Sequence, residues 1–160
     1  MSASKNLQEQ RQQNSQHIAA RLREFLPAIL CNYPVEAAYI FGSVARGVAT
    51  PLSDIDIGVL LTNSLPAHER LNLELSIQAA IEDETGLAPV DVRSLNDAPL
   101  LVKGRIVQQG NLVYERNRRS RVVFEVATRK QYFDFAPVAR RLQDAFLEHV
   151  HREGLLRDRS

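Results

Sequence analysis

Residues 42–56 place two carboxylates one residue apart, shortly after a glycine-flanked turn. The segment reads GSVARGVATPLSDID, in which ten residues separate a Gly-Ser pair from Asp-x-Asp. Asp54 and Asp56 lie at positions i and i+2 of an expected strand or of its entrance, so both side chains leave one face about 6.5–7 Å apart at the backbone. Two like charges at this separation repel each other by about 2–3 kcal/mol at an effective dielectric near 20. A divalent cation such as Mg²⁺ reverses that repulsion, because it binds hard oxygen ligands.

The Gly-Ser half of the segment supplies groups that bind anions. Gly42 allows the backbone to approach a ligand closely, and Ser43 offers a hydroxyl and an amide N–H. A short helix is expected to follow and to point its N-terminus at the same place, and Arg46 adds a positive charge within one turn. Each half alone is common in turns. Together, between two expected strands, they predict a phosphate cradle beside a metal, as a nucleoside triphosphate requires.

A third carboxylate follows in the segment APVDVRSL, where Asp91 stands between Val90 and Val92. If this strand neighbours the strand that contains Asp56, the three carboxylates form one acidic cluster, as in a one- or two-metal site for phosphoryl transfer. Arg93 shares a face with Asp91, and we interpret it as an ion-pair partner of that carboxylate, with a phosphate contact as the alternative.

The elements that must position these residues are short strands separated by helices. Apolar patterns predict a strand that ends at Phe41, strands over 55–61 and 111–115, and another centred on 90–92. The expected fold class is therefore α/β (α+β), with a small mixed sheet flanked by helices.

The helices between these strands are predicted from periodicity and capping residues. Leu71, Leu75 and Ile81 are expected to face the core from a helix that follows Pro66. Asn96 or Asp97 is expected to cap the next helix.

The chain is expected to form one domain with extensions at both ends. Residues 1–15 are polar and Gln-rich, and are expected to be frayed or to extend the first helix. Residues 16–115 are predicted to form the domain that carries the site. Residues 116–160 read as a helical segment, interrupted by Pro137, that packs on the domain or on a partner.

Composition narrows the function classes. The net charge of +1 selects neither a nucleic acid nor a membrane as a partner, and Cys31, the single cysteine, excludes an internal disulfide and is expected to be buried. No apolar run approaches the roughly 20 residues of a membrane span, so we expect a cytoplasmic protein.

The segment after residue 115 has two features that a partner can use. The arginines Arg116, Arg118, Arg119 and Arg121 are interpreted as a solvated basic face, with docking to an acidic protein surface as the alternative and RNA as a weaker one. The apolar residues that follow are predicted to be mostly core, with a stripe for a partner as the alternative; they are Val122, Val123, Val126, Tyr132, Phe133 and Phe135.

The segment GSVARGVATPLSDIDIGVLL resembles the signature of the DNA polymerase β-like nucleotidyltransferase superfamily, with the spacing of its minimal (MNT) branch, and VDVRSL stands where that family has its third acidic residue. The resemblance implies a polymerase β-like fold with ATP as substrate and Mg²⁺ as cofactor. By position, Gly42 and Ser43 would hold the triphosphate, and Asp54 and Asp56 would ligate magnesium. Asp91 would complete the metal site and help to activate the acceptor hydroxyl.

The resemblance also suggests the acceptor. Template-directed and tRNA-modifying relatives carry extra nucleic-acid domains, for which 160 residues leave no room. Among small MNT proteins, the chain resembles the MntA-type antitoxins of HEPN/MNT pairs, and this resemblance implies transfer of AMP to a tyrosine of a HEPN ribonuclease toxin. The alternatives are an adenylyltransferase for an aminoglycoside-like small molecule, and a non-catalytic antitoxin that blocks its toxin by binding.

Overall fold

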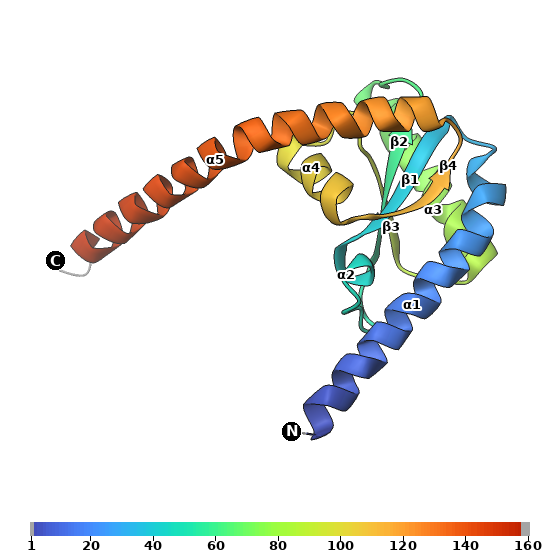
Figure 1. The fold of residues 1–160 in the computed structure, drawn as a ribbon, viewed down its shortest axis with the longest axis horizontal. Helices are drawn as coiled ribbons and strands as arrows, with labels where there is room; N and C mark the ends of the chain where they lie inside the picture. The colour runs from blue at the N-terminus through green and yellow to red at the C-terminus, as the bar shows by residue number, and fades with distance from the viewer. Residues whose placement is uncertain (1, 158–160) are drawn as a thin grey trace.

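The computed structural model describes residues 2–157, and a four-stranded sheet forms its centre (Figure 1). The elements follow one another along these residues as α1 (Ser2–Leu30), β1 (Val35–Phe41), α2 (Gly42–Ala45), β2 (Ile55–Leu61), α3 (Ala67–Thr85), β3 (Val90–Ser94), α4 (Leu100–Gln109), β4 (Asn111–Glu115) and α5 (Arg118–Arg157). The strand order is β3-β2-β1-β4, with β2 parallel to β3 and the other two pairs antiparallel. A mixed sheet flanked by helices confirms the predicted fold class.

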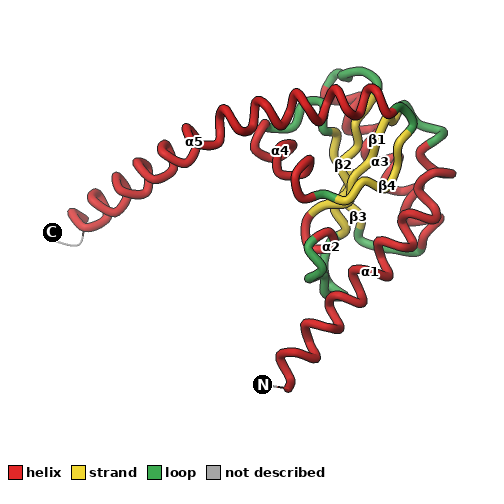
Figure 2. Tube along the Cα trace, in the orientation of Figure 1, coloured by secondary structure: helices red, strands yellow, loops and turns green. Residues whose placement is uncertain are grey.

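Helices cover both faces of the sheet (Figures 1 and 2). On one face, α1 and α3 pack over the larger core, which includes the fully buried Leu22, Ile57 and Ile81. On the other face, α4 and the beginning of α5 cover a smaller core that includes Leu60 and Ile106. Each such side chain contributes about 1.5–3 kcal/mol when it is buried, so the first face carries most of the apolar stabilisation.

The helices match some sequence-based expectations and differ from others. The polar N-terminal residues continue α1 from Ser2, so they extend the first helix, which was one of the two alternatives for them. In α3 the prediction for Leu71 and Leu75 was wrong, because both are half exposed while Ile77 and Ile81 are buried. The prediction for Cys31 was also wrong, because this residue lies exposed in the turn after α1.

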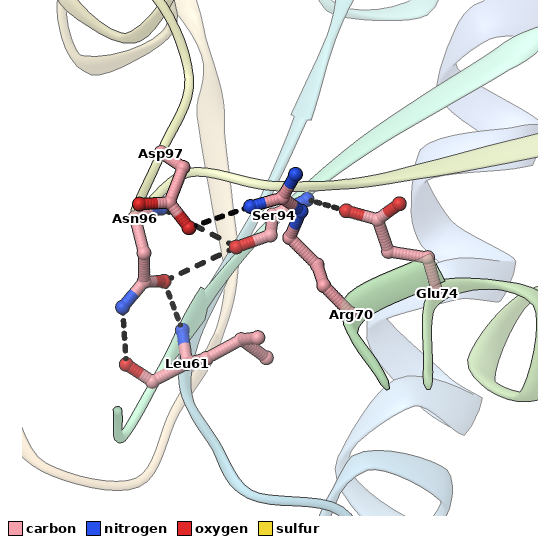
Figure 3. Close-up of polar contacts among 6 residues, drawn as sticks. All are labelled: Leu61, Arg70, Glu74, Ser94, Asn96 and Asp97. Carbon is pink, nitrogen blue, oxygen red and sulfur yellow. Dashed lines mark hydrogen bonds and ion pairs between the residues drawn. The ribbon is translucent and has the colours of Figure 1, made fainter. Parts of the chain in front are cut away.

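Polar side chains hold the loop that follows β3 in place (Figure 3). Asn96 accepts a hydrogen bond from the Leu61 amide at 2.8 Å and donates one to the Leu61 carbonyl at 3.0 Å. Asp97 forms an ion pair with Arg70 at 2.7 Å. Neither residue caps α4, which begins after Pro99, so that prediction was wrong. Their side chains instead tie the loop to β2 and α3.

Two glutamates of α3 accept hydrogen bonds from β3. Glu74 Oε1 accepts from the Ser94 amide at 2.7 Å, and Glu82 Oε1 accepts from the Val90 amide at 2.8 Å. The Leu95 amide donates to the Val59 carbonyl of β2. Because amides alternate in direction along a strand, the amides of Val90 and Ser94 point away from β2, toward the helix that supplies these carboxylates.

α5 packs on the domain through its first part and extends beyond it (Figure 1). Gly104 of α4 admits Tyr132, because a Cβ at Gly104 would lie 2.1 Å from the Tyr132 ring. The Tyr39 hydroxyl donates to Glu125 at 2.8 Å. Pro137 lies within α5 and does not interrupt it, which corrects the prediction of a break.

The predicted burial of most apolar residues in the first part of α5 was wrong. Val123, Val126 and Phe133 are each about 60% exposed, whereas Thr128 is buried and Phe124 packs against the smaller core. The helix therefore uses another face for the domain, which leaves the alternative of a partner surface open. No helix within residues 2–157 is long and apolar enough to cross a membrane.

The basic segment that begins α5 is in part structural. Arg116 donates to the Leu30 and Cys31 carbonyls at 3.0 and 2.7 Å, and so closes the end of α1 against β4. Arg121 forms ion pairs with Glu115 and Glu125, and these interactions raise its pKa further above the ordinary arginine range.

Candidate active site

The structure brings Asp56 and Asp91 together at one end of the sheet. The two residues are register partners in the parallel strands β2 and β3, and neighbouring strands lie about 4.8 Å apart. Asp54 directly precedes β2 and is exposed. Because Ile55 and Ile57 turn toward the larger core, Asp56 faces the opposite side of the sheet, which α4 covers. The predicted adjacency of these two strands is confirmed.

Gly42 lies directly against the carboxylate of Asp56. Phe41 pairs with Asp56 across β1 and β2, so the chain turns into α2 beside that side chain. Gly42 has a φ of 66°, and a Cβ there would lie 1.9 Å from Oδ2 of Asp56. The position therefore requires glycine for two reasons, the left-handed backbone and the lack of space for a side chain.

Burial and neighbouring charges both act on the ionisation of Asp56. Its pKa is raised, first by burial and then by the charges of Asp91 and Asp54, while Arg46 acts in the opposite direction. Desolvation and like-charge repulsion thus both destabilise the ionised form of Asp56 in the folded state. A group of carboxylate oxygens is the ligand chemistry that Mg²⁺ prefers.

The third carboxylate is engaged by an arginine. Nε of Arg93 donates to both carboxylate oxygens of Asp91, at 3.0 and 3.1 Å, which confirms the predicted ion pair. Within the described part of the chain, no group of three or more His, Cys, Asp or Glu side chains is arranged as it stands to hold a metal ion. Binding by all three carboxylates therefore requires Asp91 to share or to leave this arginine.

α2 is a single turn that follows Gly42. The Arg46 amide donates to the Gly42 carbonyl at 3.3 Å, and the Val48 amide donates to the Ser43 carbonyl at 3.0 Å. Gly47 has a φ of 73° and ends the turn. These bonds fix the turn that contains Ser43 and Arg46 directly after Gly42, and the charge of Arg46 acts on Asp56.

A cavity of about 240 Å³ opens beside this turn. Its residues come from the end of β1, from α2 and from one face of α4, namely Phe41, Gly42, Ala45, Arg46, Val102, Arg105, Ile106 and Gln109. The α4 residues of this lining were not predicted from the sequence. Their spacing of three and four residues indicates a common helix face, but only the fold shows that this face meets α2.

A known protein family matches this chain. The model of the family described as "Polymerase beta, Nucleotidyltransferase" matches residues 24–119. Asp54, Asp56 and Asp91 all lie within this range. Comparison with the curated proteins gives no match.

Several solved structures share the fold at low sequence identity. A toxin–antitoxin complex with AMP-PNP is 23% identical with a TM-score of 0.63, covering 78% of this chain and 98% of that chain. The toxin–antitoxin MntA-HepT is 24% identical with a TM-score of 0.53, covering 85% and 98%. A tri-AMPylated Shewanella oneidensis HEPN toxin in complex with an MNT antitoxin is 23% identical with a TM-score of 0.53, covering 86% and 98%.

Proposed function

Because this chain belongs to the polymerase beta nucleotidyltransferase family, we propose that it is a Mg²⁺-dependent antitoxin that transfers AMP from ATP to a tyrosine hydroxyl of a HEPN ribonuclease toxin. The observation that carries the proposal is the register of Asp56 and Asp91, with Gly42 seated against Asp56. The proposed acceptor is supported by the similar structures, one of which is a tri-AMPylated HEPN toxin in complex with an MNT antitoxin.

The chemistry is a displacement at the α-phosphorus of ATP. The tyrosine oxygen forms a bond to this phosphorus, the bond to the bridging oxygen breaks, and pyrophosphate leaves. Bound Mg²⁺ would neutralise the phosphates and steady the leaving oxygen. Asp54 and Asp56 would hold the metal, and Asp91 would also help to take the proton of the hydroxyl. Gly42, Ser43 and Arg46 would hold the phosphate tail beside them.

We assign the cavity between α2 and α4 to the nucleoside part of ATP. It adjoins Gly42 and Arg46, so a nucleotide with its phosphates at the carboxylates can reach it. Its apolar wall suits the flat face of a base, and the polar groups of Arg105 and Gln109 lie on the α4 side.

Filling this cavity should weaken nucleotide binding without unfolding the protein. Val102 lines the cavity and is 45% exposed, so Val102→Trp adds volume there without disrupting the core. We expect the Kd for MgATP, measured by calorimetry, to rise about ten-fold or more, which corresponds to about 1.4 kcal/mol. Leu101→Trp, on the same helix but outside the cavity lining, is the matched control. Equal affinity in both variants would place the nucleoside elsewhere.

The transfer itself is tested by mass spectrometry of the intact toxin. The purified protein is incubated with ATP, Mg²⁺ and a candidate HEPN toxin, and the intact mass of the toxin is measured. A gain of one or more AMP units, absent with Asp54→Asn, supports the proposal. Inhibition of the ribonuclease with no mass gain would favour a non-catalytic antitoxin. Transfer to an aminoglycoside, with none to the toxin, would favour the small-molecule enzyme.

A further inference from the structure

Arg93 is tied to the acidic cluster through a single carboxylate. It stands two residues after Asp91 on β3, so both side chains leave the same face of the strand. Its Nε donates to both oxygens of Asp91. Asp91 in turn faces Asp56 across the two parallel strands. The guanidinium therefore supplies positive charge to a cluster whose three carboxylates repel one another.

Hydrogen bonds hold the backbone on both sides of this ion pair. Before it, the Val90 amide donates to Glu82. After it, the Ser94 amide donates to Glu74, and Asn96 holds the following loop to Leu61 (Figure 3). Any change in the partner of Arg93 must therefore occur by rotation of its own side chain or that of Asp91, while the strands stay in register.

The ion pair is open enough to exchange. The side chain of Arg93 is 63% exposed and that of Asp91 is 41% exposed, and ion pairs at such exposure contribute little to stability and are screened by salt. Arg93 also lines a cavity between α3 and α4 whose other residues include Glu74 and Asp97. This cavity can therefore accommodate the guanidinium after its release from Asp91, and two carboxylates line it.

We propose that the guanidinium of Arg93 occupies the acidic cluster in place of a metal ion, and that it pairs with Asp91 until a divalent metal displaces it. This inference rests on the proposed function, because it assigns the role of a metal ligand to Asp91. Arg93 is a positioning residue here and acts only through Asp91. It neutralises part of the negative charge of the cluster between catalytic cycles, and it competes with the metal for Asp91.

The test measures the affinity for metal alone, without ATP or toxin. Mn²⁺, which shares the carboxylate preference of Mg²⁺, is titrated into the full chain and free Mn²⁺ is followed by electron paramagnetic resonance. We expect Arg93→Gln to bind Mn²⁺ about two- to five-fold more tightly than the wild type, as the loss of an exposed competing ion pair implies. In an Asp91→Asn background, Arg93→Gln should change the affinity no further.

Arg70→Gln is the matched control. Arg70 lines the same cavity and forms an exposed ion pair, but with Asp97 instead of a residue of the cluster. Its replacement removes the same charge and should leave the Mn²⁺ affinity unchanged. A second measurement uses NMR, with diamagnetic Mg²⁺ in place of Mn²⁺. The Nε–H resonance of Arg93 should shift as Mg²⁺ is titrated into the protein.

Three results would overturn the inference: unchanged or weaker Mn²⁺ binding by Arg93→Gln, an equal gain in Arg70→Gln, or a gain that persists without Asp91. AMP transfer is measured separately with the same wild-type preparation. If the wild type transfers AMP and one of these three results is also obtained, only the role of Arg93 is contradicted, and the proposed function stands. A wild type that neither binds metal nor transfers AMP contradicts the proposed function as well.

Discussion

Asp56→Asn is expected to lose AMP transfer by about 10³-fold or more and, in magnesium-free buffer, to melt at a higher temperature than the wild type. The loss follows because a metal ligand at the reacting phosphate contributes several kcal/mol to the transition state. The gain follows because Asp56 pays for burial and for repulsion by Asp91 and Asp54 in the folded protein. Transfer is measured by the mass of the toxin, and stability by thermal unfolding followed by circular dichroism.

The pH dependence of that gain has a definite sign. The pKa of Asp56 is raised in the folded state above its ordinary value of 3.8, so folding favours the protonated form. The penalty is therefore full above the raised pKa, and it disappears as the pH falls through that value toward 3.8. The difference in melting temperature between Asp56→Asn and the wild type should shrink over the same range. A variant that melts lower than the wild type at neutral pH would contradict this account.

Gly42→Ala is expected to remove nucleotide binding and to destabilise the fold. The residue has a φ of 66°, which alone costs an L-residue about 1–2 kcal/mol. In addition, the new methyl group would lie 1.9 Å from Oδ2 of Asp56, so either the turn or this carboxylate must move. We expect the Kd for MgATP to rise by about 100-fold or more, equivalent to about 2.7 kcal/mol, together with a lower melting temperature.

Gly86→Ala separates the two causes. Gly86 has the same φ of 66° at the end of α3, but a Cβ there meets no atom within 4 Å. This variant should show the backbone cost and keep its affinity for MgATP. If Gly42→Ala bound MgATP as well as Gly86→Ala does, the contact between Gly42 and Asp56 would have no role in holding the ligand.

The strands and the acidic positions were predictable because their signals are local. The apolar run 55–61 and the segment 111–115 match β2 and β4, since a strand buried on one or both faces leaves its pattern in neighbouring residues. The pairing of Asp56 with Asp91 also followed, because a helix between two strands favours a parallel neighbour.

The errors arise where tertiary packing selects between equivalent patterns. In α3 the sequence favoured Leu71, Leu75 and Ile81. Of these only Ile81 faces the core, together with Ile77, which was not predicted. In α5 the apolar residues Val123 and Val126 lie on the exposed side. The face that a helix presents depends on its neighbours, and the α4 wall of the nucleotide cavity was missed for the same reason.

The two glutamates of α3 that bind the amides of Val90 and Ser94 have a consequence beyond local order. β3 is the outermost strand on its side of the sheet, and an outer strand with open amides is a template on which a second polypeptide can add a strand. Here two of those donors are already satisfied by carboxylates from the same chain. The glutamates thus leave fewer open donors on this edge, which disfavours the addition of a second strand.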